Sequence, residues 1–226
     1  MVVITLSSKT SDLHENLIHA IELDKNREYE IALINLWTCN SIPNITPKNC
    51  SFKYGDKIAV LDTGAYEINN IISALKTKLN ITDDSLIINA NPNTMKVSIF
   101  SDKPVDLSAT NSIGKTLGFN KILLEANMWH YSDHLLSISQ ISTIIVSCNL
   151  ACGSFANGVE KHTIFEFLPK VPAGYLINET PAQIIYVPLN TYRIQFINVR
   201  ITDQEGSLID FRGDTVTVKL HIREKK

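Results

Sequence analysis

Apolar and polar residues alternate along the C-terminal part of the chain. Residues 193–202 and 215–223 place an apolar side chain at every second position over most of their length. In an extended chain this period puts the apolar side chains on one face and the polar ones on the other. Both segments therefore predict strands with one face in a hydrophobic core. The side chains expected to face that core are Ile197, Val199, Ile201, Val216, Val218, Leu220 and Ile222.

The alternation changes phase once within residues 193–202. Ile194 and Phe196 occupy even positions, whereas Ile197 and the apolar residues after it occupy odd positions. One extra residue in a strand produces such a slip, so we predict a β-bulge near Phe196-Ile197.

Shorter apolar runs, rich in β-branched and aromatic residues, predict further strands. They cover residues 2–6, 29–37, 51–54, 57–61, 86–90, 95–100, 143–149, 162–168 and 184–189. Two of the connections carry turn signals, Gly55-Asp56 and Asn91-Pro92-Asn93.

Helical periodicity is clearest in residues 66–79, where apolar side chains three and four apart form one stripe. These side chains are Ile68, Ile71, Ile72, Leu75 and Leu79. A second, shorter helix is predicted over residues 108–117, with Gly118 able to end it. Residues 7–28 are polar and irregular and predict a short helix or an extended arm. Residues 121–136, with Trp129, predict a packed excursion without regular structure.

These elements indicate an all-β fold, because about ten strands follow one another without βαβ alternation. We expect a single jelly roll or β-sandwich with two short helical insertions in the N-terminal half. No polar linker divides the chain, so residues 1–226 are predicted to form a single jelly-roll domain. Residues 1–28 would supply its first strand and the arm.

The composition of the chain limits the classes of function that are expected. The chain has 226 residues, 44% hydrophobic, and a formal net charge of −2. No basic surplus is available to neutralise a phosphate backbone, so direct nucleic-acid binding is not expected. No apolar run reaches the ~18 residues of a membrane span. The N-terminus lacks the pattern of a signal peptide, so we expect synthesis inside a cell without secretion. Cys39, Cys50, Cys148 and Cys152 have no disulfide-framework spacing and are predicted to be free thiols.

Asp62-Thr63-Gly64-Ala65 follows an apolar run and matches the catalytic tetrapeptide of retroviral-type aspartic proteases. The continuation does not fit such an enzyme, because an amphipathic helix follows and no Gly-rich flap is found. We therefore favour a strand-end turn, with Glu67 in the first turn of the helix.

Two further motifs suggest ligand binding but lack essential partners. Ile113-Gly114-Lys115-Thr116 resembles the end of a phosphate-binding loop, yet Ala109 stands where that loop needs glycine. His130 and His134, with Asp133 between them, have the spacing of metal ligands on a helix, but no third ligand is evident. The remaining candidates, Cys148, Cys152 and His162, lack a zinc-site spacing. We predict no catalytic, cofactor-binding or metal-binding residues and no cofactor.

Arg212-Gly213-Asp214 is the tripeptide that integrins recognise. It directly precedes the strand predicted at residues 215–223. A turn that uses Gly213 is the simpler interpretation.

An ordered set of segments resembles one recurrent open reading frame of Polintons (Mavericks) and their adintovirus relatives. The segments in the second half are LGFN at 117–120, NMWHYSD at 127–133, CNLACGSFANG at 148–158, HTIFEFLPKVPAGYLINETP at 162–181, IIYVPLN at 184–190 and RITDQEGSLIDFRGDTVTVKLHIR at 200–223. The first half resembles it more loosely, through YEIALINL, SIPNI and TGAYEI. Residues 7–28 have no counterpart in this resemblance.

We identify that frame with the minor capsid (penton) protein. The resemblance implies a single jelly roll that forms homopentamers at capsid vertices, beside a double-jelly-roll major capsid protein. It also implies location in the virion. In this family the position of Asp62 need not be aspartate and that of Asp214 is often glutamate, which argues against protease and integrin functions.

Two other classes of function stay open at this point. One is a β-sandwich receptor- or carbohydrate-binding module, or a domesticated host protein, with an exposed aromatic groove. The other, less favoured, is the aspartic protease. If the chain forms a ring, residues 7–28 and the excursion at 121–136 are the predicted seam.

Overall fold

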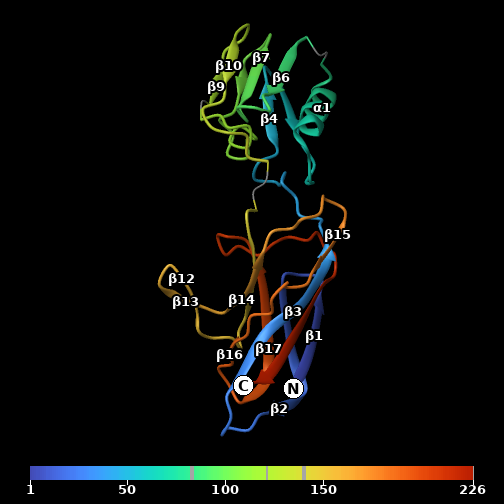
Figure 1. The fold of residues 1–226 in the computed structure, drawn as a ribbon. Helices are drawn as coiled ribbons and strands as arrows, with labels where there is room; N and C mark the ends of the chain where they lie inside the picture. Colours follow the sequence, from blue (N-terminus) through green and yellow to red (C-terminus); the bar gives the residue numbers. More distant parts are fainter. Residues whose placement is uncertain (82–83, 121, 139–140, 226) are drawn as a thin grey trace. The chain divides into compact units, whose positions relative to one another are not determined.

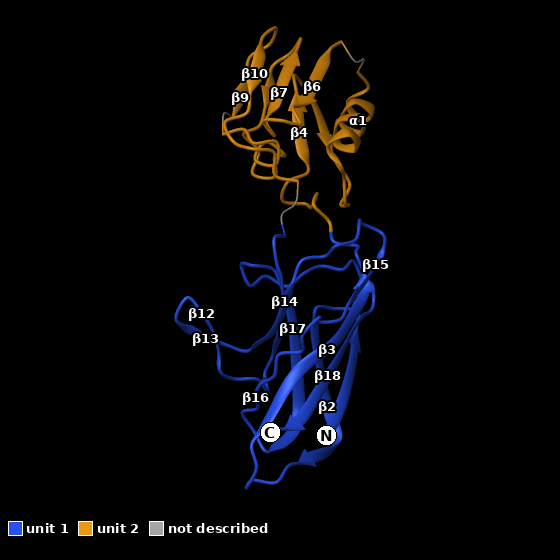
Figure 2. Ribbon diagram, in the orientation of Figure 1, with its two compact units in different colours: residues 1–42, 141–226 blue, residues 43–140 orange. Residues whose placement is uncertain are grey.

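The computed structural model describes residues 1–81, 84–120, 122–138 and 141–225 (Figure 1). Contacts divide the chain into two compact units, shown in Figure 2. Unit 1 comprises residues 1–42 and 141–226, and unit 2 comprises residues 43–140. Each unit has a hydrophobic core of its own. From the sequence we predicted a single domain over residues 1–226, because neither segment that joins the two units is polar enough to be recognised as a linker.

Unit 1 contains two antiparallel sheets. Sheet I has the order β1 (Val2–Ser8), β18 (Val216–Glu224), β3 (Tyr29–Cys39) and β15 (Leu176–Glu179), and the short β16 (Val187–Pro188) also pairs with β3. Sheet II has the order β14 (Thr163–Phe167), β11 (Ile144–Cys148), β17 (Arg193–Thr202) and β2 (Asp12–Glu22). A separate hairpin, β12 (Ser154–Ala156) and β13 (Val159–Lys161), connects β11 to β14.

The strand order of unit 1 is that of a jelly roll. If its eight main strands are numbered along the chain, sheet I has the order 1-8-3-6 and sheet II the order 5-4-7-2. Successive strands mostly alternate between the sheets, as in the double-sheet, Greek-key arrangement. Unit 2 is inserted between the third and fourth of these strands, β3 and β11. The prediction of a mostly-β, jelly-roll-like fold is confirmed.

The core of unit 1 is built from the alternating strands. Val216, Val218, Leu220 and Ile222 are at most 1% exposed, as predicted, and they pack with apolar side chains of both sheets. Lys219 and His221 point to the other face and are half-buried. Thr217 shares that face but is covered, and its hydroxyl lies 2.9 Å from the Ser7 hydroxyl on β1.

Residues 7–28 are neither a helix nor a free arm, so that prediction is wrong. Half of them form β2, which pairs with β17 and buries Leu13 in the core. The spacing of Leu13, Leu17 and Ile21 resembles a helical stripe because the pairing of β2 is irregular. The register jumps between Ile194 and Phe196, so the residues between Asn16 and Ile21 lie opposite Gln195 alone. This register shift lies just before the position predicted for a β-bulge, but the extra residues belong to β2 and not to β17.

Unit 2 contains two sheets and the helix α1 (Ile68–Leu79). Sheet III has the order β10 (Trp129–Tyr131), β7 (Val97–Ser101) and β6 (Leu86–Ala90). Sheet IV has the order β5 (Lys57–Val60), β4 (Ser51–Tyr54), β8 (Val105–Asp106) and β9 (Leu123–Leu124). The helix contacts β5 and β6, and it buries Ile71, Leu75 and Leu79 as the periodicity predicts.

The second predicted helix, residues 108–117, is wrong: this described segment consists of turns and one bridge. Its backbone forms isolated turns, such as the Leu117 amide to the Ile113 carbonyl at 3.1 Å, and also pairs with β4, where the Ile113 amide donates to the Ser51 carbonyl at 2.9 Å. Gly118 has φ +84°, as expected of a residue that ends such a turn. The strand predicted at 184–189 shortens to β16, and β15 was not predicted. No helix in the described ranges is long and apolar enough to span a membrane.

Candidate functional site

The Asp62 tetrapeptide lies in a turn that follows β5. The Asp62 side chain is 84% exposed and accepts a hydrogen bond from Lys78 Nζ at 3.0 Å. The Tyr66 hydroxyl donates to the Asp62 carbonyl at 3.0 Å, and Gly64 forms an isolated bridge with Ile45. An aspartic-protease carboxylate shares a proton with a second carboxylate, whereas the observed partner of Asp62 is an ammonium group. The geometry favours the structural role predicted for this turn, but Glu67 is the N-cap residue of α1 and does not lie in its first turn as expected.

We predict that Asp62→Asn changes stability little and creates or removes no peptidase activity. An exposed ion pair such as Asp62–Lys78 contributes at most ~1 kcal/mol, so the melting temperature should fall by only a few degrees. The measurements are a thermal melt and cleavage of a peptide library between acidic and neutral pH. Acid peptidase activity that the substitution abolishes would contradict this interpretation.

Residues 113–116 do not form a phosphate-binding loop. No helix follows them in the described chain, and the Gly114 amide donates to the Ser112 hydroxyl at 3.1 Å. Thr116 is buried and its hydroxyl lies 3.1 Å from the Asn49 amide, whereas Lys115 is exposed. The amides and the hydroxyl that a phosphate would need are therefore engaged within the protein.

The side chains weighed as metal ligands in unit 2 are likewise engaged in hydrogen bonds within the protein. His130 is buried in β10, where Nε2 lies 2.9 Å from the Glu125 carbonyl. His134 Nε2 lies 2.8 Å from the Asn120 side-chain amide, and Asp133 accepts from the Asn120 backbone amide at 2.8 Å. Within the described ranges, no group of three or more metal-ligating side chains comes together.

Among the described residues, Cys148, Cys152 and His162 of unit 1 belong to no group of three or more potential metal ligands. Burial raises the pKa of the Cys148 thiol to about 11, so it stays protonated at neutral pH and is a poor metal ligand. His162 Nδ1 lies 2.6 Å from the Ala151 carbonyl. All four cysteines are free thiols, as predicted.

Arg212-Gly213-Asp214 lies in a tight turn before β18. Arg212 and Gly213 have φ values of +55° and +78°, and the Asp214 amide donates to the Phe211 carbonyl at 3.0 Å. Two central residues with positive φ are typical of a type I′ turn, which explains the glycine. The Arg212 amide also donates to the Asp210 carboxylate at 2.7 Å, so the segment is locally ordered and not a long loop.

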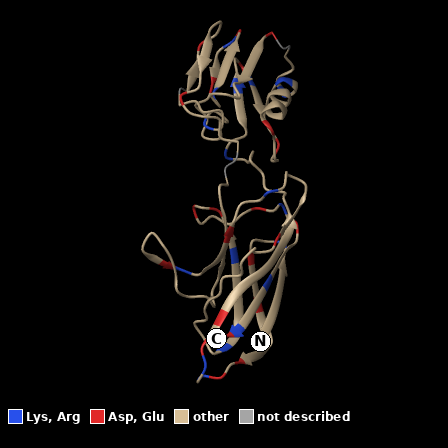
Figure 3. Cartoon of the chain, viewed as in Figure 1, with Lys and Arg blue, Asp and Glu red and all other residues tan. Residues whose placement is uncertain are grey.

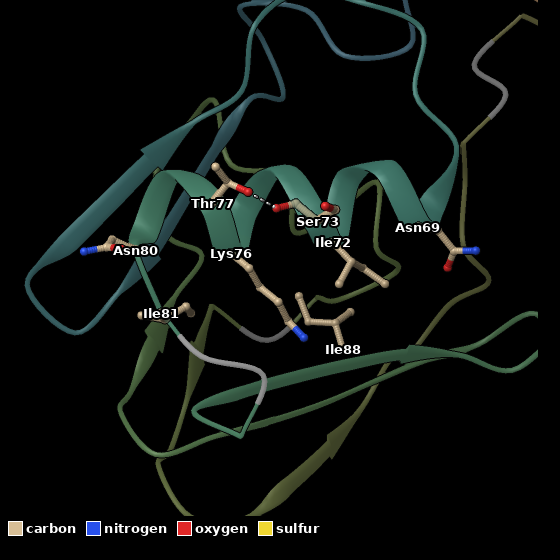
Figure 4. Close-up of a pocket in the computed structure, with 8 residues that line it drawn as sticks. All are labelled: Asn69, Ile72, Ser73, Lys76, Thr77, Asn80, Ile81 and Ile88. Carbon is tan, nitrogen blue, oxygen red and sulfur yellow. Dashed lines mark hydrogen bonds between the residues drawn. The ribbon is translucent and has the colours of Figure 1, made fainter.

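One groove in unit 2 lies between α1 and β6 and has a volume of about 570 Å³ (Figure 4). Its walls are largely neutral and polar, with Asn69, Ser73, Thr77 and Asn80 on the helix side. The Thr77 hydroxyl donates to the Ser73 carbonyl at 2.9 Å, as is common within helices. Ile88, at the opposite wall, is 7% exposed and belongs to the core. Among the described residues that line the groove, no constellation of catalytic side chains is found.

The hairpin β12–β13 is the most exposed element of unit 1 and forms a sheet with no third strand (Figure 2). Asn157 and Gly158 both have positive φ, the requirement of its two-residue turn. Phe155 and Val159 are 69% and 58% exposed. The sequence analysis did not predict this hairpin, although the Asn157-Gly158 dipeptide is its signal.

The outer faces of sheets I and IV carry ion pairs. On sheet I, Arg223 and Glu30 form an ion pair at 2.6 Å, and the Arg223 guanidinium lies over the Tyr186 ring. On sheet IV, Lys53 and Asp106 form an ion pair at 3.0 Å. Figure 3 shows acidic and basic residues intermixed in both units, without a large basic area on the side in view.

Comparison with known proteins shows a likeness in fold. No protein-family model matches the chain, and no curated protein matches it. Among solved structures, the selenomethionine-labelled mavirus penton protein matches with a TM-score of 0.52 and 10% sequence identity. The match covers 99% of this chain and 99% of that chain. At this identity the likeness shows a shared fold, which includes both units.

Proposed function

We propose that the protein is a structural, non-enzymatic capsid protein, the penton subunit at the vertices of a virion. The observation that carries the proposal is the eight-strand jelly roll of unit 1, interrupted by unit 2, in a fold shared end to end with a viral penton protein. The sequence resemblance to the minor capsid protein of Polintons and adintoviruses supports the same assignment independently.

The proposed partners are other capsid proteins. The chain forms a homopentamer, and the pentamer is surrounded by a double-jelly-roll major capsid protein. The chain is made inside the host cell and incorporated into the virion as one subunit comprising both units. It requires no cofactor and does not itself contact nucleic acid.

The seam of the ring belongs to the flanks of unit 1. A five-fold ring needs two different surfaces of one subunit that fit each other. A two-stranded hairpin is marginally stable alone, and β12–β13 presents Phe155 and Val159 to solvent. We place this hairpin against the neighbouring copy. Two segments were expected at the seam, residues 7–28 and 121–136, but we place neither there: the first contains β2 of sheet II, and the second contains the regular strands β9 and β10 of unit 2.

We expect the purified chain to form particles of five times the 25.3 kDa of one chain. Multi-angle light scattering should give this mass at micromolar concentrations, and negative-stain images should show five-fold rings. A stable monomer across several salt and pH conditions, with no rings in images, would contradict the proposal and favour a monomeric binding module.

The double variant Phe155→Ser/Val159→Ser should shift the particles toward monomer, because it removes the exposed apolar contacts without touching the core. The matched control is Ile58→Ser, an equally exposed residue on β5 of unit 2. An unchanged pentamer in the hairpin variant would place the seam elsewhere on unit 1.

A further inference from the structure

The outer face of sheet III carries a row of apolar and aromatic side chains. Across the three strands, Trp129 pairs with Phe100 and Phe100 pairs with Ile87. All three side chains point away from the core, because their strand neighbours His130, Ile99 and Ile88 are the buried ones. In the next row on the same face, Tyr131 pairs with Ser98, and Ser98 pairs with Asn89.

Two aromatic rings on this face, those of Trp129 and Tyr131, are exposed to solvent and lie on the same strand. Trp129 is 44% exposed and Tyr131 is 71% exposed. They are two residues apart on one strand, so both stand on the same face. Phe100 is half-buried and packs against Trp129, with ring centroids 5.5 Å apart and planes tilted by 45°. This contact supports the Trp129 ring from one side and leaves the rest of it free.

Charge distinguishes this face from the others. None of its six strand side chains is ionisable near neutral pH, whereas the outer faces of sheets I and IV each carry an ion pair. Charged residues lie just beyond the strands, at Lys96 and Asp102 on either side of β7 and at Asp133 two residues after Tyr131. Asn89 and Ser98 add neutral hydrogen-bonding groups, and the Asn89 side-chain amide has no hydrogen-bond partner among the described residues. A neutral ligand that combines apolar and hydroxyl surface would match this face.

The size of the face argues against a second protein as its occupant. A stable protein interface uses about 20–30 residues on each side. The face offers six strand side chains, and the outer face of sheet IV in the same unit is charged. A small ligand is therefore favoured over a second copy of the chain.

We propose that the outer face of sheet III binds a neutral carbohydrate. The rings of Trp129 and Tyr131 would stack on the C–H faces of successive sugar rings, and Asn89 and Ser98 would bond to sugar hydroxyls. Aromatic rings with a polar edge suit a ligand that is apolar on its faces and polar at its rim. The inference goes beyond assembly and does not rest on it, since the pentamer seam was placed in unit 1.

The test uses the full chain on an array of neutral and sialylated oligosaccharides, followed by titration of the best-binding neutral oligosaccharide. Trp37 and Trp129 are the two tryptophans, so Trp37→Phe leaves Trp129 as the only tryptophan reporter of binding. We expect binding of one or more neutral oligosaccharides and a saturable change in Trp129 fluorescence. Tyr131→Ala should weaken binding about tenfold, the factor expected from losing one stacking contact.

Two substitutions at one position separate stacking from simple apolar contact. Trp129→Phe should keep most of the affinity, whereas Trp129→Leu, which keeps apolar surface without a ring, should lose it. Ile58→Ala on sheet IV is the matched control and should bind like the unchanged chain. The proposal is overturned if no neutral oligosaccharide binds, if only sialylated ones bind, or if Trp129→Leu binds as well as Trp129→Phe. None of these outcomes alters the particle mass, so the capsid proposal would stand.

Discussion

Replacing Val218 with aspartate is expected to unfold unit 1. Val218 has no exposed surface and lies on β18, the strand between β1 and β3 in sheet I. A carboxylate at this position would be buried among apolar side chains of both sheets without a partner. The expected cost is on the order of 4 kcal/mol or more, a large fraction of the ~5–15 kcal/mol by which domains are stable.

The same substitution on the opposite face of sheet I provides the control. Val3 lies on β1, is 55% exposed, and pairs with His221. Val3→Asp therefore places its charge in solvent and should cost less than about 1 kcal/mol. Urea unfolding followed by circular dichroism measures both variants. Similar midpoints for Val218→Asp and Val3→Asp would show that the sandwich is not packed as described.

Deleting residues 1–24 is expected to abolish the fold of unit 1, not merely weaken a ring. The deletion removes β1 and β2, one strand from each sheet, together with Ile4, Leu6 and Leu13 of the core. Sheet I would expose the edge of β18 and sheet II the edge of β17. The remaining half-covered sandwich should lack cooperative unfolding and be prone to aggregation.

Limited proteolysis with mass spectrometry reads out each unit separately. In the truncated chain, fragments of unit 1 should be digested, whereas unit 2, which has its own core, should survive. Replacing the hairpin residues 154–161 with two glycines serves as the comparison, since it removes no core side chain and should leave both units resistant. A truncated chain that resists proteolysis throughout would show that residues 1–24 are a dispensable arm.

The strands predicted best from the sequence are those with one face in the core and the other face turned away from it. On β18, every apolar residue from Val216 to Ile222 faces the core, so period-two alternation was a complete description. The helix α1 was equally clear, because a single stripe of isoleucine and leucine contacts the core of unit 2. In both cases one element buries one continuous face, so the spacing of its apolar residues predicts which side chains are buried.

Prediction failed where long-range pairing overrides local pattern. β2 is an edge strand with only Leu13 fully buried, so its burial pattern is weak, and its irregular pairing with β17 obscures the alternation. Residues 108–117 have helical spacing, but their backbone bonds to β4, far away in sequence. The candidate carbohydrate face could not be predicted either, because Trp129 and Tyr131 join the other residues of this face only when β10 pairs with β7.

The pairing of the first strand with the last has a consequence for synthesis of the protein. β18 lies between β1 and β3, and its Ile222 pairs with Val2 of β1. The strands and helix of unit 2 are synthesised before β18, so sheet I can be completed only after residues 216–224 have been made. A chain that stops before β18 lacks the middle of sheet I and leaves the facing edges of β1 and β3 unpaired. Unit 2, which has its own core, can therefore fold on the ribosome while unit 1 is still incomplete.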